Sequence, residues 1–139
     1  MQVNMGGTIA LAHQFRGHTN GDTVVFFPTE RVIAMGDLMT TTLPAMASYA
    51  DGGNWMDLGK SLDEIAKMDF DFAVPGHGPV ATKEDVVAYR DKLAAMKARI
   101  REMVHAKESQ DEIAAALKEE FQWGAPASNS LPAVMQELR

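Results

Sequence analysis

The sequence predicts an α/β (α+β) protein with one mixed β-sheet and helices on the outer face of that sheet. In the first half, apolar residues alternate or run continuously between glycine-containing turns, which is typical of strands. In the second half, apolar residues recur every three or four positions after good helix-starting residues, as in amphipathic helices. The 139 residues are predicted to form a single domain, with a core over residues 1–106 and a helical extension over residues 107–139.

Short strands joined by tight turns account for residues 1–35. Residues 1–4 and 8–15 are predicted to pair through a hairpin at Gly6-Gly7. The apolar run 24–27 is predicted to be the next strand, and residues 32–35 are predicted to return from it. The return strand would deliver Asp37 on its exit loop. Because both strands of this pair are largely apolar, cover is expected on both sides of the sheet.

The remaining chain alternates helices with one further strand. Asn54, Thr82 and Ser109 each precede an apolar helical stripe and can cap a helix start. The predicted helices cover residues 43–49, 55–68, 83–105, 110–121 and 131–138, and the additional strand covers residues 70–74, just before His77.

Composition excludes several classes of function. The formal net charge of −6 argues against binding to nucleic acid or to anionic membranes. No cysteine is present, so neither disulfides nor thiolate ligands are available. The sequence contains no membrane-spanning run and no signal peptide. These observations predict a cytoplasmic protein, unless a longer gene carries a signal in a first half.

Three glycine-flanked turns carry side chains suited to a metal ion. They are Gly17-His18-Thr19-Asn20-Gly21-Asp22, Gly36-Asp37 and Pro75-Gly76-His77-Gly78-Pro79. Each follows an apolar run, so the side chains are expected at strand ends on tight loops. Two imidazoles and one carboxylate suit zinc, and they also suit iron or manganese. The sequence therefore predicts that His18, Asp37 and His77 are metal ligands.

These three blocks, in this order, resemble the second half of the metallo-β-lactamase superfamily. The similarity extends from about Met1 to about Ile100. It implies half of an αββα sandwich, in which two sheets pack face to face with helices outside. It also implies a metallo-hydrolase whose complete site holds two zinc ions. In that arrangement His18 and His77 would each hold one ion, and Asp37, as the catalytic residue, would bridge the two.

The first-half signature of the family, His-x-His-x-Asp-His, does not occur in this sequence. The four histidines are His13, His18, His77 and His105; His13 is interpreted as a face-packing residue and His105 as a surface residue. The resemblance therefore implies a C-terminal half that holds one zinc ion or none by itself. Met1 can equally be an internal start of a longer gene.

Two functions remain open at this stage. The first is a metal-dependent hydrolase in which activated water attacks an ester, lactone, thioester or amide-type bond of a small-molecule substrate. This activity would require a homodimer through the inner sheet face, or a separate N-terminal half. The alternative is a non-catalytic dimeric relic or binding module that retains part of the metal site.

Two groups of side chains also have two interpretations each. Met46, Tyr49 and Trp55 either contact substrate or pack in the core, and packing is favoured. The apolar stripe of residues 86–103 either forms a coiled-coil dimer seam or packs on the sheet, and packing is again favoured.

Overall fold

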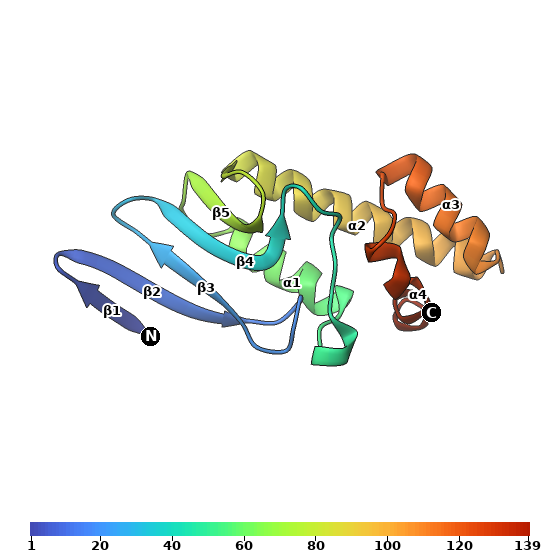
Figure 1. Ribbon diagram of the computed structural model, residues 1–139, viewed down its shortest axis with the longest axis horizontal. Coiled ribbons are helices and arrows are strands. Elements are labelled where there is room, and N and C mark those ends of the chain that lie inside the picture. Colours follow the sequence, from blue (N-terminus) through green and yellow to red (C-terminus); the bar gives the residue numbers. More distant parts are fainter.

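The computed structural model describes residues 1–139 and confirms the predicted α+β class. A single six-stranded mixed sheet lies against helices, as Figure 1 shows. The strands are β1 (Gln2–Met5), β2 (Thr8–Phe15), β3 (Asp22–Phe27), β4 (Val32–Thr40), β5 (Phe72–His77) and β6 (Ala81–Thr82). The helices are α1 (Trp55–Ala66), α2 (Lys83–His105), α3 (Gln110–Phe121) and α4 (Leu131–Glu137), with 3₁₀ turns η1 (Tyr49–Asp51) and η2 (Ala127–Ser130).

Spatial order in the sheet follows the order of the chain from β1 to β6. All neighbouring strands are antiparallel except β4 and β5, which are parallel. A parallel pair needs a crossover connection, and α1 provides it. Because β4 and β5 run in the same direction, their carboxyl ends meet at one edge of the structure. Asp37 and His77 both come from that end.

One face of the sheet is covered by α1 and α2. Val24, Ile33 and Ala73 point to this side and are completely buried. The apolar stripe of α2 is buried within the same chain, against α1, α3, α4 and the sheet. Its buried members are Val86, Leu93, Met96, Ile100 and Met103. The stripe therefore packs inside the molecule and does not form an exposed seam.

The other face of the sheet has no covering layer. The strand register places the same-face residues of β3, β4 and β5 in adjacent rows. These residues are Val25, Phe27, Val32, Ala34, Phe72 and Val74. Phe72 and Val74 lie on β5, at the end of these rows, and are 51% and 41% exposed. The apolar face that the sequence predicts is thus present and accessible.

The C-terminal extension packs against the first part of the chain. The rings of Trp123 and Trp55 meet edge to face at 5.2 Å between centroids. The Trp123 indole nitrogen also donates a hydrogen bond of 2.9 Å to the Ala45 carbonyl. Leu131 and Val134 of α4 belong to the same cluster of buried residues as the helices behind the sheet. A single hydrophobic core therefore extends from β3 to α4.

The strands that carry Asp37 and His77 extend beyond their predicted ends, and β3 begins at Asp22, before its predicted start. The return strand β4 continues to Thr40, so Asp37 lies within it and not on an exit loop. Similarly, β5 continues through Pro75 and ends at His77 itself. Both extensions come from pairing between β4 and β5, including the register pair Thr40 and His77. This long-range pairing has no local sequence signal.

The predicted helix at residues 43–49 is wrong. Only the 3₁₀ turn η1 forms in this region, and residues 41–48 contain no α-helix. Pro44 lacks a backbone N–H, and the carbonyls of Ala45 and Met46 accept hydrogen bonds from Trp123 and His18. Long-range partners have replaced the helical hydrogen bonds.

None of the helices is both long and apolar enough to cross a membrane.

Candidate metal centre

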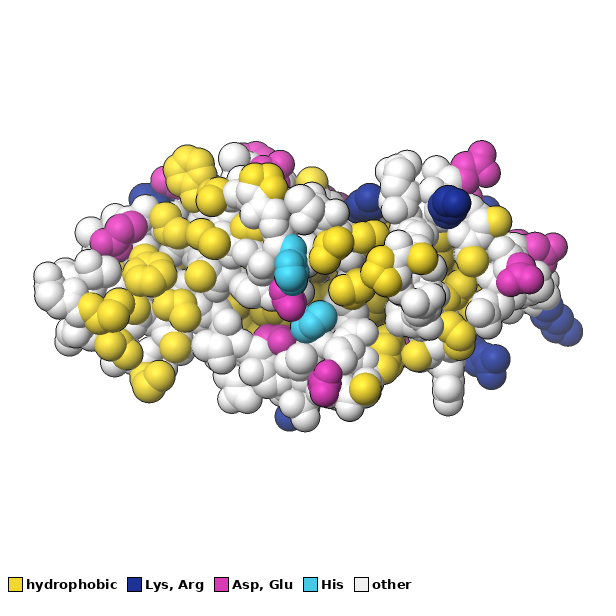
Figure 2. All heavy atoms as spheres, viewed as in Figure 1, with side chains coloured by type: hydrophobic (Ala, Val, Ile, Leu, Met, Phe, Trp, Pro, Cys, Tyr) yellow, Lys and Arg dark blue, Asp and Glu magenta, His cyan; other side chains and the backbone are white.

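His18, Asp37 and His77 come together on the uncovered side of the molecule, with Asp37 in the middle. His18 Nε2 lies 3.5 Å from one carboxylate oxygen of Asp37, and His77 Nε2 lies 3.4 Å from the other. Figure 2 shows the two imidazoles on either side of a carboxylate near the centre of this face. The side chains are 20%, 37% and 55% exposed for His18, Asp37 and His77. A small molecule therefore has access to all three.

The turn after β2 holds His18. The Asp22 carboxylate accepts hydrogen bonds from the Thr19 backbone N–H and hydroxyl, which closes the turn. His18 Nδ1 lies 3.2 Å from the Met46 carbonyl oxygen. Because a carbonyl oxygen only accepts, Nδ1 carries the proton of the neutral ring. Nε2 then presents its lone pair towards Asp37, which is the tautomer a metal ligand needs.

Asp37 is placed by an irregularity in β4. The register with β5 shifts on both sides of Gly36, which has a φ of +55°. Such a φ favours glycine, and the resulting bend turns the Asp37 side chain towards the two histidines. Gly76 lies directly against the Asp37 carboxylate, where a Cβ atom would collide with Oδ1. The glycine of the His77 turn therefore creates the space that the carboxylate occupies.

His77 is held by the connection that follows β4. Its carbonyl oxygen accepts a 2.9 Å hydrogen bond from the Thr41 backbone N–H. The Thr41 hydroxyl bonds to the carbonyls of both His77 and Pro79. The backbone of His77 is thus tied to the segment that directly continues the strand carrying Asp37. The imidazole is more exposed than that of His18.

The donor set is chemically suited to zinc, iron or manganese, as expected from the residue types. No group of three or more histidine, aspartate or glutamate side chains is arranged around a point where a single ion would bind. Instead, each histidine faces its own oxygen of Asp37. The three side chains are therefore close together, but they do not enclose a position for a single ion.

The other residues named from the sequence lie elsewhere. His13 is exposed on β2, so its interpretation as a face-packing residue is wrong. His105 is exposed at the end of α2, as expected. Trp55 is completely buried and packs on Trp123, so it does not contact a ligand. Met46 and Tyr49 pack against the core.

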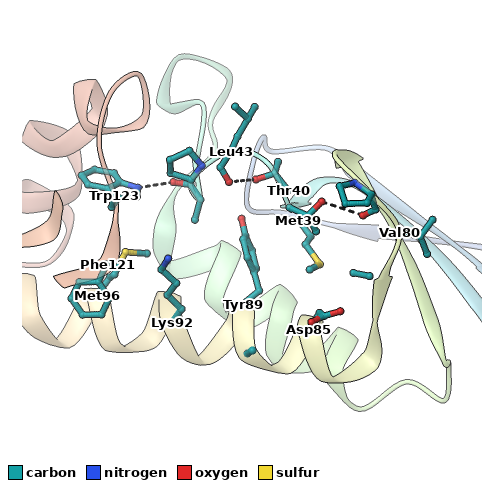
Figure 3. A pocket seen from close by; sticks show the side chains of 16 residues that line it. Met39, Thr40, Leu43, Val80, Asp85, Tyr89, Lys92, Met96, Phe121 and Trp123 are labelled. Atoms are coloured by element: carbon teal, nitrogen blue, oxygen red, sulfur yellow. Dashed lines mark hydrogen bonds between the residues drawn. The ribbon is translucent and has the colours of Figure 1, made fainter. Parts of the chain in front are cut away.

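A cavity of about 460 Å³ lies next to the His77 turn, between α2 and the segment 39–45 (Figure 3). Tyr89 of α2 lines it, and the Tyr89 hydroxyl is buried without a hydrogen-bond partner. Burial raises the pKa of Tyr89 to about 12; the Asp37 carboxylate adds to the rise, while Thr40 acts in the opposite direction. Sequence patterns do not single out this residue, because Tyr89 falls within the apolar stripe of α2.

Comparison with known families gives one clear match. A model described as the metallo-beta-lactamase superfamily matches residues 3–77, more than half of the chain. A search among curated proteins gives no match.

Solved structures share the fold. A metallo-beta-lactamase family protein from Thermus thermophilus is 19% identical, with a TM-score of 0.73, over 100% of this chain and 46% of that protein. A metallo-beta-lactamase from Pontibacter korlensis is 18% identical, with a TM-score of 0.59, and the match covers 68% of this chain and 45% of that protein. The stereoselective inverting sec-alkylsulfatase Pisa1 from Pseudomonas sp. is 15% identical, with a TM-score of 0.70, and the match covers 99% of this chain and 25% of that protein. The chain thus spans less than half the length of each.

Proposed function

The chain belongs to the metallo-beta-lactamase superfamily, and on this basis we propose that it is a metal-dependent hydrolase. Its ligands are His18, Asp37 and His77. The observation that carries the proposal is that Asp37 offers one carboxylate oxygen to each histidine Nε2, at 3.5 and 3.4 Å. At His18, whose Nε2 is an acceptor when the ring is neutral, this separation from a carboxylate oxygen is unfavourable unless a proton or a metal cation lies with the two atoms.

The protein's own residues contribute orientation and charge. The Met46 carbonyl fixes the His18 tautomer, so that Nε2 remains free to bind. Asp37, in the role of a bridging ligand, holds its carboxylate between the two imidazoles, because β4 and Gly76 fix its position. Bound zinc would supply a water molecule whose pKa is lowered towards about 7, which provides a nucleophile at neutral pH. No serine or cysteine nucleophile is required.

The substrate class is an ester, lactone, thioester or amide-type bond in a small molecule. Exposure of Asp37 and His77 supports access of such a molecule from the uncovered side. The fold alone does not choose among these bonds, because one fold hosts many reactions.

The first test is zinc binding, measured by isothermal titration calorimetry on protein purified without chelator. His18→Gln and His77→Gln should each weaken zinc binding at least about tenfold, because even groups that only orient a metal ligand change affinity by about 10–100-fold. His13→Gln is the matched control, since His13 is exposed and outside the site. Equal zinc affinity in all four proteins would contradict the proposal.

Hydrolysis is then assayed on p-nitrophenyl esters, lactones and thioesters, with and without chelator. Turnover that disappears with the chelator and in Asp37→Asn is expected. Zinc binding without turnover on any substrate would favour the alternative, a binding module that retains part of the site.

We also infer that a second copy of the chain covers the apolar sheet face. The uncovered apolar residues of β3, β4 and β5 lie in adjacent rows of the sheet, and Figure 2 shows hydrophobic side chains gathered over the strands on this face. Such a surface is typical of an interface. The two metallo-beta-lactamase structures are much longer than their matched parts, which are 46% and 45% of each, so a second layer of similar size fits here. A separate N-terminal half is the competing occupant.

A further inference from the structure

The cavity beside the candidate metal centre has a mostly apolar wall, to which helix α2 adds the polar groups of Tyr89 and Lys92. Ten of its sixteen lining residues are hydrophobic. Pro79 and Val80, just after His77, line one end, and Phe121 and Trp123 line the other. The cavity therefore begins just after the His77 turn and runs along α2 towards the end of α3.

Tyr89 and Lys92 supply the polar groups. They are three residues apart on α2 and so lie on one face of the helix. In Figure 3 both side chains point from α2 into the cavity, towards the segment that carries Leu43. They are both hydrogen-bond donors at neutral pH, and a ligand that satisfies them must therefore offer acceptor oxygens.

The Tyr89 hydroxyl makes no hydrogen bond of good geometry within the protein, and the exposed Lys92 ammonium has no charged partner. The Tyr89 hydroxyl is buried and has no partner. Thr40 is its neighbour, but the Thr40 hydroxyl donates to the Leu43 carbonyl at 2.6 Å. Lys92 forms no ion pair; the adjacent Asp91 pairs with Arg90. A buried hydroxyl without a partner is destabilising, so a ligand acceptor at this position would be favoured.

From this arrangement we propose that the cavity binds an amphipathic organic anion, with its apolar part against the walls and its anionic oxygens on Tyr89 and Lys92. This inference rests on the proposed function, because the bound anion would be the non-reacting part of the substrate of the proposed hydrolase. The reacting bond would then lie at the His77 end.

The acidic residue in the cavity wall does not oppose this assignment. Asp85 lines the cavity, but its carboxylate accepts from the Thr82 backbone N–H and hydroxyl as a helix cap. Asp85 is also seven residues from Lys92, about 10 Å along the helix. The positive charge of Lys92 therefore remains available at the far part of the cavity.

The test uses octanoate as the probe and 1-octanol as its neutral counterpart. Binding is followed by NMR of ¹³C-methyl methionine, because Met39 and Met96 line the cavity while Met5 is exposed on the sheet side. Octanoate should shift the Met39 and Met96 methyl signals and leave Met5 unchanged. Tyr89→Phe and Lys92→Gln should each raise its dissociation constant about five- to tenfold, as expected for a lost hydrogen bond to a charged group.

Lys118→Gln is the matched control, because Lys118 is an exposed lysine outside the cavity. Three results would overturn the inference: no shift at Met39 and Met96 with millimolar octanoate, equal binding of 1-octanol, or unchanged affinity in both variants. All titrations are repeated with chelator and in Asp37→Asn. Binding that persists there while zinc binding is lost separates this inference from the proposed function.

Discussion

The two tyrosines of the chain occupy environments that oppose ionisation. Tyr49 is half-buried, and its hydroxyl donates a 2.6 Å hydrogen bond to the Glu137 carboxylate. Burial, followed by this carboxylate, raises the pKa of Tyr49 well above its usual value. The pKa of Tyr89 is held at about 12, mainly by burial. Both groups therefore remain neutral in the folded protein at a pH where they ionise in the unfolded chain.

This difference predicts loss of stability in alkali. A tyrosine whose pKa is raised by folding contributes its full stability below about pH 10, the unfolded value, and loses it as pH rises towards the folded value. Through Tyr89, the free energy of unfolding should fall by about 1.4 kcal/mol per pH unit between about pH 10 and 12, and the half-buried Tyr49 should add a smaller fall because solvent screens it. Urea unfolding across this range measures the slope, and Tyr89→Phe should reduce it. An unchanged slope in Tyr89→Phe would disprove the role of burial at this residue.

Residue types predicted which side chains come together near the sheet, but not which side chains line the cavity beside them. His18, Asp37 and His77 were identified from glycine-flanked turns, and the structure brings all three together. Tyr89 and Lys92 could not be identified from the sequence. A tyrosine within an apolar helical stripe has the pattern of a core residue, and a lysine on the same helix has the pattern of a solvent-exposed residue. Their shared cavity depends on segment 39–45, which is distant in sequence.

At the scale of elements, the last helix caps the first. The Glu137 carboxylate of α4 accepts hydrogen bonds from the backbone N–H groups of Trp55 and Met56, at 3.1 and 2.6 Å. These are free donors of the first turn of α1, where the helix dipole also favours negative charge. Asn54 caps the same turn through its side chain. The start of α1 is thus stabilised both by the neighbouring Asn54 and by Glu137, which is distant in the sequence.

Glu137→Ala should destabilise the protein by about 2 kcal/mol, because it removes three hydrogen bonds to one carboxylate and leaves two helix donors without partners. Chemical denaturation measures the loss. Gln136→Ala is the control, since Gln136 is exposed and its replacement should change stability by less than about 0.5 kcal/mol. Equal stability of the two variants would rule out the cap.

Elements set by local signals were predicted well. Asn54, Thr82 and Ser109 each accept a hydrogen bond from the first turn of the helix that follows, as their positions in the sequence indicate. The conformation of segment 43–49 was not predicted, because its carbonyl oxygens accept hydrogen bonds from His18 and Trp123, which lie in other parts of the chain. Sequence patterns report contacts between near neighbours, whereas this segment is shaped by distant ones.

At the scale of the whole molecule, the sheet has helices on one face and an open apolar surface on the other. Because the helical side is complete and forms one buried core, association through the helices is not expected. Association through the sheet would bury Phe72 and Val74 and place two copies of the His18, Asp37 and His77 cluster near the same interface. The assembly proposed above therefore depends on side chains of β3, β4 and β5.

Phe72→Lys should dissociate that assembly. The wild-type protein should have twice the 15.2 kDa mass of the chain by light scattering coupled to size exclusion. A lysine at the half-exposed Phe72 would place charge in the interface, and the variant should elute as a monomer. Ala95→Lys, on an exposed position of α2, should remain dimeric. A monomeric wild-type protein would exclude the homodimer and leave the N-terminal half as the occupant.

The edge-to-face pair of Trp55 and Trp123 also provides an internal optical reporter. They are the only two tryptophans of the chain, and one starts α1 while the other follows α3. Two indoles in such close contact couple their electronic transitions, so the near-ultraviolet circular dichroism carries a signal that exists only while the extension is docked. Detachment of the C-terminal extension would therefore be visible without any label, before the sheet itself unfolds.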